Sequence, residues 1–432
     1  MISRFDDVEN KQKYNEVLLK NQKWEYSAPV SNNRRVKPFL DDIKENTCDM
    51  RYGESNGRVW VDGHRLAHDG TFLPHWREFA NALEEYQYAL KCLPEETASK
   101  FYIWDIGLPK RVLDLLSNAL ESTHFKKFGL RRNQFGRDSR DGIKFALNYI
   151  QNNPKLESFD FGGNTINHED DLNRLCEIIK GHPAINAIEL ESCDNLVDGH
   201  RMLCSIMTAG KNKLKSIDLS YNMIKTGGST FIADFLTTNP ILENLMLDGN
   251  GLFDNDAISI ARALKKNTNL RYLNILGNNL ADAGWDDDDG STIVTEPGWD
   301  ALRKAEFDST SLNSATDSNH TCFIRIPSHN EINGEDDNEG PFDRKALRQK
   351  KIYSILSARN RKCSNSNVLY FSDVPVEFLP DMLISIQQYS GYYTGYNAPP
   401  KHHKHAESLS VVYEVMRRWD KVISVYESLG NN

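Results

Sequence analysis

The chain has 432 residues, of which 26% are charged and 39% apolar, and its formal net charge is −9. This composition is typical of a soluble protein, and the acidic balance argues against nonspecific nucleic-acid binding as its main role. The start of the chain lacks the apolar core of a secretory signal, and no stretch approaches the roughly 18 apolar residues that span a membrane. Seven scattered cysteines without a C-x-x-C pair indicate reduced thiols, so we expect an intracellular protein of the cytoplasm, with the nucleus as the alternative compartment.

Residues 1–72 form an N-terminal region that reads as partly irregular, with RVWVDGHRLAHDG (58–70) predicting a short hairpin. The segment 73–93 is an amphipathic helix, whose apolar side carries Trp76, Phe79 and Leu83. We assign 73–100 to an N-terminal cap helix.

Six in-phase copies of one pattern follow, L-x-x-L-x-L-x-x-[N/C]-x-[L/I], with the last apolar residue of the third copy one place late. They start at residues 125, 156, 185, 214, 242 and 270, so their spacing is 31, 29, 29, 28 and 28 residues. The apolar run predicts a short strand, and the asparagine or cysteine that follows it in the pattern predicts a turn. These turn residues are Asn133, Asn164, Cys193, Asn222, Asn250 and Asn278. Apolar residues at helical spacing, such as Ile143, Leu147 and Ile150, predict a helix after each turn.

The pattern resembles the leucine-rich repeat family, in its ribonuclease-inhibitor-like subclass. The resemblance implies an α/β fold: a horseshoe-shaped solenoid with a parallel concave sheet, outer helices and helical caps at both ends. It covers at least 125–280, and we extend it to about eight repeats over 101–325, with FYIWDI (101–106) as the first strand. Such arrays need caps because an end repeat otherwise exposes its core.

The triplet Gly-Trp-Asp occurs at 284–286 and again at 298–300, and four aspartates follow the first copy. We expect the strand after the 270 copy at Leu312, an interval of 42 residues that equals a 28-residue repeat plus a 14-residue insertion near 286–299. A solvated acidic loop is the main interpretation. The alternative is a calcium loop, with Asp287, Asp289, Gly290 and Glu296 at its positions 3, 5, 6 and 12. Because Trp285 replaces the first ligand and Pro297 disfavours an exit helix, we assign no metal site.

The strand residues that face the concave surface form a central column that is rich in carboxylates. We place Asp105, Gly129, Asn274 and Thr316 in this column, and Lys126, Lys127, Arg131 and Arg132 in a basic corner beside it. Two interpretations stay open: a surface that binds a partner of opposite charge, or a solvated strand face. The partner-binding candidates are Asp160, Glu189, Glu191, Asp218, Tyr221, Met246, Asp248 and Tyr272.

Residues 326–341 are polar and acidic, which predicts a flexible loop, and 342–432 read as a C-terminal helical cap region. Within it, 342–362 is basic: it reads as a cap helix with a solvated basic face, or as a nuclear-import patch or a contact to an anionic surface. His402, His403 and His405 lack further ligands at a recognised spacing, so they predict no metal site.

No P-loop, G-x-G-x-x-G, G-x-S-x-G or H-E-x-x-H motif occurs in the sequence. We therefore expect no enzyme and no cofactor, but a noncatalytic interaction module or scaffold that binds a protein partner, which the acidic column predicts to be basic. We expect neither nucleic-acid nor membrane binding, and the pattern does not indicate an oligomeric state. The alternative is a regulator of a small GTPase, because Ran GTPase-activating proteins have similar repeats. An immune-type sensor is a third alternative, weakened because this chain lacks a nucleotide-binding motif.

Overall fold

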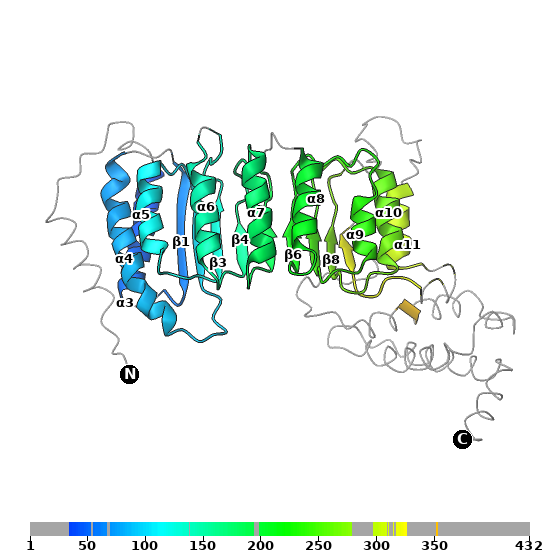
Figure 1. Cartoon of the computed structure of the whole chain (residues 1–432), viewed down its shortest axis with the longest axis horizontal. Coiled ribbons are helices and arrows are strands. Elements are labelled where there is room, and N and C mark those ends of the chain that lie inside the picture. Colours follow the sequence, from blue (N-terminus) through cyan, green and yellow to red (C-terminus); the bar gives the residue numbers. More distant parts are fainter. Residues whose placement is uncertain are drawn as a thin grey trace, which may run out of the picture. The chain divides into compact units, whose positions relative to one another are not determined.

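The computed structural model describes residues 34–52, 55–66, 70–137, 139–193, 198–278, 297–308, 310, 314, 317–325 and 351–352 (Figure 1). The chain divides into two compact units. The first unit holds 1–226 and 241–251, and the second holds 227–240 and 252–432. Each unit is described separately.

Within the described residues, the first unit contains seven parallel strands, which pair in the order in which they follow along the chain. They are β1 (Arg58–Leu66), β2 (Lys100–Ile106), β3 (Lys127–Arg131), β4 (Ser158–Asp160), β5 (Ala187–Glu189), β6 (Ser216–Asp218) and β7 (Asn244–Met246). Parallel neighbours need a crossover, and helices supply most of these crossovers. The helices are α3 (Val36–Tyr52), α4 (Leu73–Lys91) with the short η1 (Gly70–Phe72) before it, α5 (Lys110–Leu120), α6 (Asp141–Asn152), α7 (Glu169–Gly181) and α8 (Gly199–Gly210).

The second unit has the same alternation. Its elements are α9 (Phe231–Thr237), α10 (Asp254–Leu264), β8 (Tyr272–Asn274), α11 (Pro297–Glu306) and β9 (Phe323–Arg325), and β8 pairs in parallel with β9. The expected α/β fold, in which parallel strands alternate with helices, is confirmed.

The core of the first unit lies between the sheet and helices α4 to α8, which cover one face of it (Figure 1). Alternate strand residues point toward these helices, and Phe101, Phe128 and Phe159 there are fully buried. Their rings stack from strand to strand, at 5.6 Å and then 6.3 Å between centroids. Phenylalanine in three consecutive strands therefore fills the core with an aromatic row.

The expected turn asparagines are buried and connect successive turns. Four of them, Asn133, Asn164, Asn222 and Asn250, each donate Nδ2 to a main-chain carbonyl one turn back, and the Oδ1 of each accepts a backbone N–H of the preceding turn. The carbonyls are those of Ile103, Leu130, Leu190 and Leu219, for Asn133, Asn164, Asn222 and Asn250 in turn. The N–H groups are those of Ile106, Asn133, Cys193 and Asn222. Cys193 departs from this ladder, because its thiol contacts Phe161 O at 3.5 Å and offers a weaker donor than an amide.

The N-terminal strands differ from the expectation in two ways. Instead of a hairpin, 58–66 forms the single strand β1, which pairs in parallel with β2. The register pairs Gly129 with Tyr102, so Asp105 does not belong to the central column. Asp105 has a φ of 61° and lies 3.4 Å from Arg65. The sequence misleads here because β2 lacks the asparagine that marks the later turns: in the observed register Ile106 stands where the next repeat has Asn133.

The second unit corrects three further expectations. The strand that pairs with β8 is Phe323–Arg325, so Arg325, and not Thr316, stands opposite Asn274. Helix α11 begins at Pro297, because the first turn of a helix tolerates a residue without an N–H. The expected calcium loop lies outside the described residues, and so do residues 286–296 of the expected insertion. Lys351, expected on a solvated basic face, is 1% exposed and donates to the carbonyl oxygens of Glu306 and Asn319.

Candidate functional site

The strand register of the first unit lines up one residue from each strand on the face away from helices α4 to α8. We call this face the open face. The central row across it consists of Trp60, Tyr102, Gly129, Asp160, Glu189, Asp218 and Met246. Neighbouring strands lie about 4.8 Å apart, so adjacent members of the row lie side by side. The predicted candidates Asp160, Glu189, Asp218 and Met246 therefore share one surface.

Three consecutive carboxylates in this row, Asp160, Glu189 and Asp218, form what we call the acidic row. Burial, and then the charges of Asp160 and Asp218, raise the pKa of Glu189 to about 7, while the charges of Arg131 and Lys127 act to lower it. Burial also raises the pKa of Asp160, although the Gly162 N–H donates to its carboxylate at 2.9 Å. The acidic row is thus an arrangement of like charges that the folded chain holds at an electrostatic cost.

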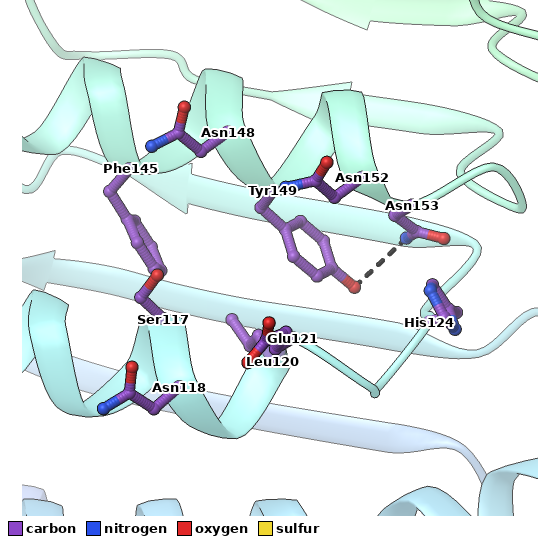
Figure 2. Close-up of a pocket in the computed structure, with 10 residues that line it drawn as sticks. All are labelled: Ser117, Asn118, Leu120, Glu121, His124, Phe145, Asn148, Tyr149, Asn152 and Asn153. Carbon is purple, nitrogen blue, oxygen red and sulfur yellow. Dashed lines mark hydrogen bonds between the residues drawn. The ribbon is translucent and has the colours of Figure 1, made fainter.

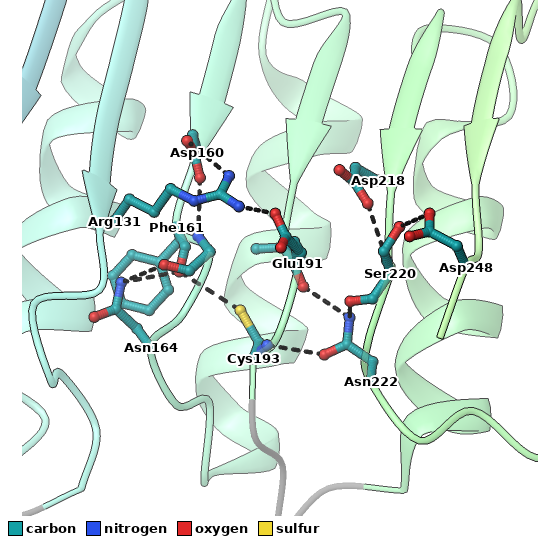
Figure 3. Close-up of polar contacts among 12 residues, drawn as sticks. Arg131, Asp160, Phe161, Asn164, Glu191, Cys193, Asp218, Ser220, Asn222 and Asp248 are labelled. Carbon is teal, nitrogen blue, oxygen red and sulfur yellow. Dashed lines mark hydrogen bonds and ion pairs between the residues drawn. The ribbon is translucent and has the colours of Figure 1, made fainter. Parts of the chain in front are cut away.

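Arg131 lies between Asp160 and Glu191 and compensates part of this charge (Figure 3). Its guanidinium is 3.5 Å from the carboxylate of Asp160 and forms an ion pair with Glu191. It also lies over the ring of Trp104, 5.6 Å from the centroid. The expectation of a basic corner is therefore wrong for Arg131, because this cation is surrounded by acidic and aromatic groups.

The C-terminal side of the acidic row is held by Ser220, as Figure 3 shows. The backbone N–H of Ser220 donates to Asp218 at 2.9 Å, and its hydroxyl donates to Asp248 at 2.6 Å. Tyr221 comes next, is 53% exposed, and leans over Gly249, where a Cβ would overlap its ring. A serine bridge therefore fixes two of the candidate carboxylates, and an exposed aromatic ring follows them.

Of the eight predicted candidates, Tyr272 alone lies in the second unit. There its ring stacks on Phe323 with 6.0 Å between centroids. The other seven lie in β4 to β7 and the residues that follow these strands.

The aromatic residues Trp60 and Trp104 belong to the open face and were not among the candidates. Trp60 is 44% exposed, stacks on Tyr102 at 5.0 Å and lies 5.5 Å from Trp104. The alternation in RVWV and FYIWDI contained the signal, because Val59, Val61, Phe101 and Ile103 point into the core. The expected hairpin at 58–70 concealed it.

A cleft of about 230 Å³ lies between α5 and α6, on the helical side of the first unit (Figure 2). The hydroxyl of Tyr149 in its wall donates to Thr123 O at 3.0 Å and accepts from Phe125 N at 3.1 Å and Asn153 Nδ2 at 3.1 Å. These bonds use the full hydrogen-bonding capacity of the hydroxyl. Tyr149 therefore stabilises the loop that leads into β3, and the cleft gives no indication of catalysis.

Across the described ranges, no group of three His, Cys, Asp or Glu side chains is arranged to hold a metal ion. The helices within those ranges are also too short or too polar to cross a bilayer.

No protein-family model matches the chain. It is 26% identical over 183 residues to Protein CARMIL of Dictyostelium discoideum, a match that covers 40% of this chain and 17% of that protein. It is 27% identical over 146 residues to human NACHT, LRR and PYD domains-containing protein 5, covering 33% of this chain and 12% of that protein. A mouse NACHT, LRR and PYD domains-containing protein, 4C, is 28% identical over 91 residues, or 21% of this chain and 9% of its own length. The chain thus spans less than a fifth of each relative.

Proposed function

We propose that this chain is a leucine-rich repeat protein and a noncatalytic interaction module, which binds a basic protein partner on the open face of its first unit. The observation that carries the proposal is the acidic row, in which the register places Asp160, Glu189 and Asp218 side by side. A parallel repeat sheet offers an extended surface, and its charge selects partners of opposite sign.

The electrostatic cost of the acidic row supports a role outside folding. Glu189 is held between two carboxylates and its pKa lies near 7, so a neutral side chain there would stabilise the fold. Groups that are kept at the expense of stability are characteristic of functional surfaces. A lysine or arginine of a partner, placed against Glu189 and Asp218, would relieve this repulsion.

Arg131 supports the proposal by limiting where such a cation binds. Its guanidinium already pairs with Asp160 and Glu191. The attraction for a second cation is therefore strongest on the side of Glu189 and Asp218. An arginine placed among fixed carboxylates also holds them in one geometry, which reduces the ordering that binding requires.

The test is charge reversal at the acidic row in the full chain, Glu189→Lys with Asp218→Lys. The matched control is Glu84→Lys with Glu177→Lys, which makes the same charge change at exposed positions of α4 and α7. Proteins captured from a cell lysate by each variant are quantified by mass spectrometry. We expect a basic protein that the wild type and the control capture and the acidic-row variant loses.

Equal capture by all three proteins would refute the acidic row as the binding surface. A captured small GTPase whose hydrolysis of GTP accelerates on adding the chain would instead favour the regulatory alternative. Purified partner and chain in a nucleotide-hydrolysis assay separate these outcomes.

A further inference from the structure

We propose that Trp60, Tyr102 and Trp104 form an anchor site for an apolar side chain of an extended protein segment whose basic residue binds the acidic row. We call these three residues the aromatic anchor. The inference rests on the proposed function and specifies the kind of partner that the open face fits.

The aromatic anchor is a continuous surface. Trp60 stacks on Tyr102 at 5.0 Å and contacts Trp104 at 5.5 Å, while the guanidinium of Arg131 lies over Trp104. Trp60 is 44% exposed, and the other two rings are half-buried. Tryptophan, tyrosine and arginine are the residues that most often dominate the energy of protein interfaces. Here these residue types meet on the solvent face of a sheet.

The anchor is joined to the acidic row through Gly129. The ring of Tyr102 lies across this glycine, because a Cβ there would overlap two of its carbons. Burial, and then the charges of Glu189 and Asp160, raise the pKa of Tyr102. The open face therefore passes from aromatic to acidic without an intervening side chain.

The dimensions and charges define the occupant. Tyr102 and Glu189 lie three strand spacings apart in the central row, which is about 14 Å, or about four residues of extended chain. An apolar residue on the anchor thus places a lysine or arginine four residues away against Glu189 and Asp218. Carboxylates at this position disfavour an acidic segment or a nucleic-acid phosphate, because like charges repel.

The experiment is a selection of random 12-residue peptides displayed on phage, against the full chain and four variants. The variants are Trp60→Ser with Trp104→Ser, Trp60→Phe, the charge reversal Glu189→Lys with Asp218→Lys, and Tyr88→Ser. Tyr88 is the matched control, since it is an aromatic residue that is 69% exposed on α4. Circular dichroism checks that each variant folds, and anisotropy of a labelled selected peptide gives the affinities.

We expect the wild type and Tyr88→Ser to select peptides with an apolar residue about four places from a lysine or arginine. Loss of both tryptophans should weaken the selected peptide at least about 30-fold, the loss typical of a dominant interface residue. Trp60→Phe should retain most of the affinity, which separates lost contact area from misfolding.

Three results would overturn the anchor. One is basic peptides that bind the double tryptophan variant as tightly as the wild type but fail to bind the charge reversal, which would leave the proposed function standing. Another is selection of a sequence found in this chain, which would make a second copy the occupant. Failure of the wild type to select any peptide would count against both the anchor and the proposed function.

Discussion

The asparagine ladder predicts a large effect of a single buried side chain, Asn222. Its Oδ1 accepts from Cys193 N at 3.0 Å, and its Nδ2 donates to Leu190 O at 2.7 Å and Ser220 O at 3.1 Å. Asn222 is 3% exposed, and Cys193 and Leu190 are fully buried. Asn222→Ala therefore leaves an N–H and a carbonyl without their partners in the protein interior.

The magnitude follows from these contacts. A buried polar group that loses its partner costs about 1–3 kcal/mol, so two such groups lower the free energy of unfolding by about 2–6 kcal/mol. Asn222→Asp keeps an acceptor for Cys193 N but removes both donors, and its charge faces Leu190 O. We expect its loss to be at least as large.

Urea unfolding followed by circular dichroism measures the change, and hydrogen exchange at the Cys193 amide localises it. Met223→Ala is the control, because Met223 is adjacent to Asn222 and 78% exposed. It should change the unfolding free energy by no more than about 0.5 kcal/mol. If Asn222→Ala were no less stable than Met223→Ala, the ladder would not hold the repeats together as argued.

Three further predictions concern pH, each measured as the difference in unfolding free energy between wild type and variant. Glu189 has a pKa of about 7 in the folded state, above its ordinary value, so between these two pKa values the folded state binds a proton that the unfolded state does not. The Glu189→Gln variant should therefore be about 1–3 kcal/mol more stable than the wild type at pH 8, and this difference should disappear below pH 4.5. An advantage that persists at pH 4 would contradict the charge argument. Burial, and then Lys44, lower the pKa of His75 to about 4, so the unfolded state binds more protons than the folded state as the pH falls. Between pH 7 and pH 4 the unfolding free energy of the wild type should therefore fall by about 1–3 kcal/mol more than that of His75→Leu. Parallel curves for the two proteins would rule this out. Burial lowers the pKa of Lys351 to about 8, so the unfolding free energy of the wild type should rise by about 1–3 kcal/mol relative to Lys351→Met between pH 8 and pH 10.5. If it did not rise, the ammonium group would lie in solvent.

The repeat pattern predicted most of the fold because it encodes strand and turn together. Alternate apolar residues set the buried side of each strand, and the asparagine after it sets the turn, as Asn164 and Asn250 show. Strand β2 lacks that asparagine, so the register predicted for it was wrong and Asp105 was placed in the central column by mistake. A repeat pattern therefore predicts the register only of those repeats that carry the turn asparagine.

The acidic row was predicted because a parallel register aligns equivalent residues of successive repeats. The ion pairs of Arg131 were not predicted, since they depend on how a long side chain lies across neighbouring strands. The two tryptophans of the aromatic anchor were missed for a related reason. Trp60 belongs to β1, which precedes every recognisable repeat and reaches the open face only by pairing with β2.

The contact between α3 and β1 has a consequence for self-association. Asn46 in α3 accepts from Trp60 N at 2.8 Å and donates to Trp60 O, so one amide side chain occupies backbone groups at the outer edge of β1. The carboxylate of Asp42 accepts from Asp62 N at 3.3 Å on the same edge. Exposed strand edges template pairing with other chains and lead to aggregation. Helix α3 therefore covers the edge of β1 and disfavours pairing with other chains. A truncated variant without α3 would expose this strand edge beside the exposed Trp60.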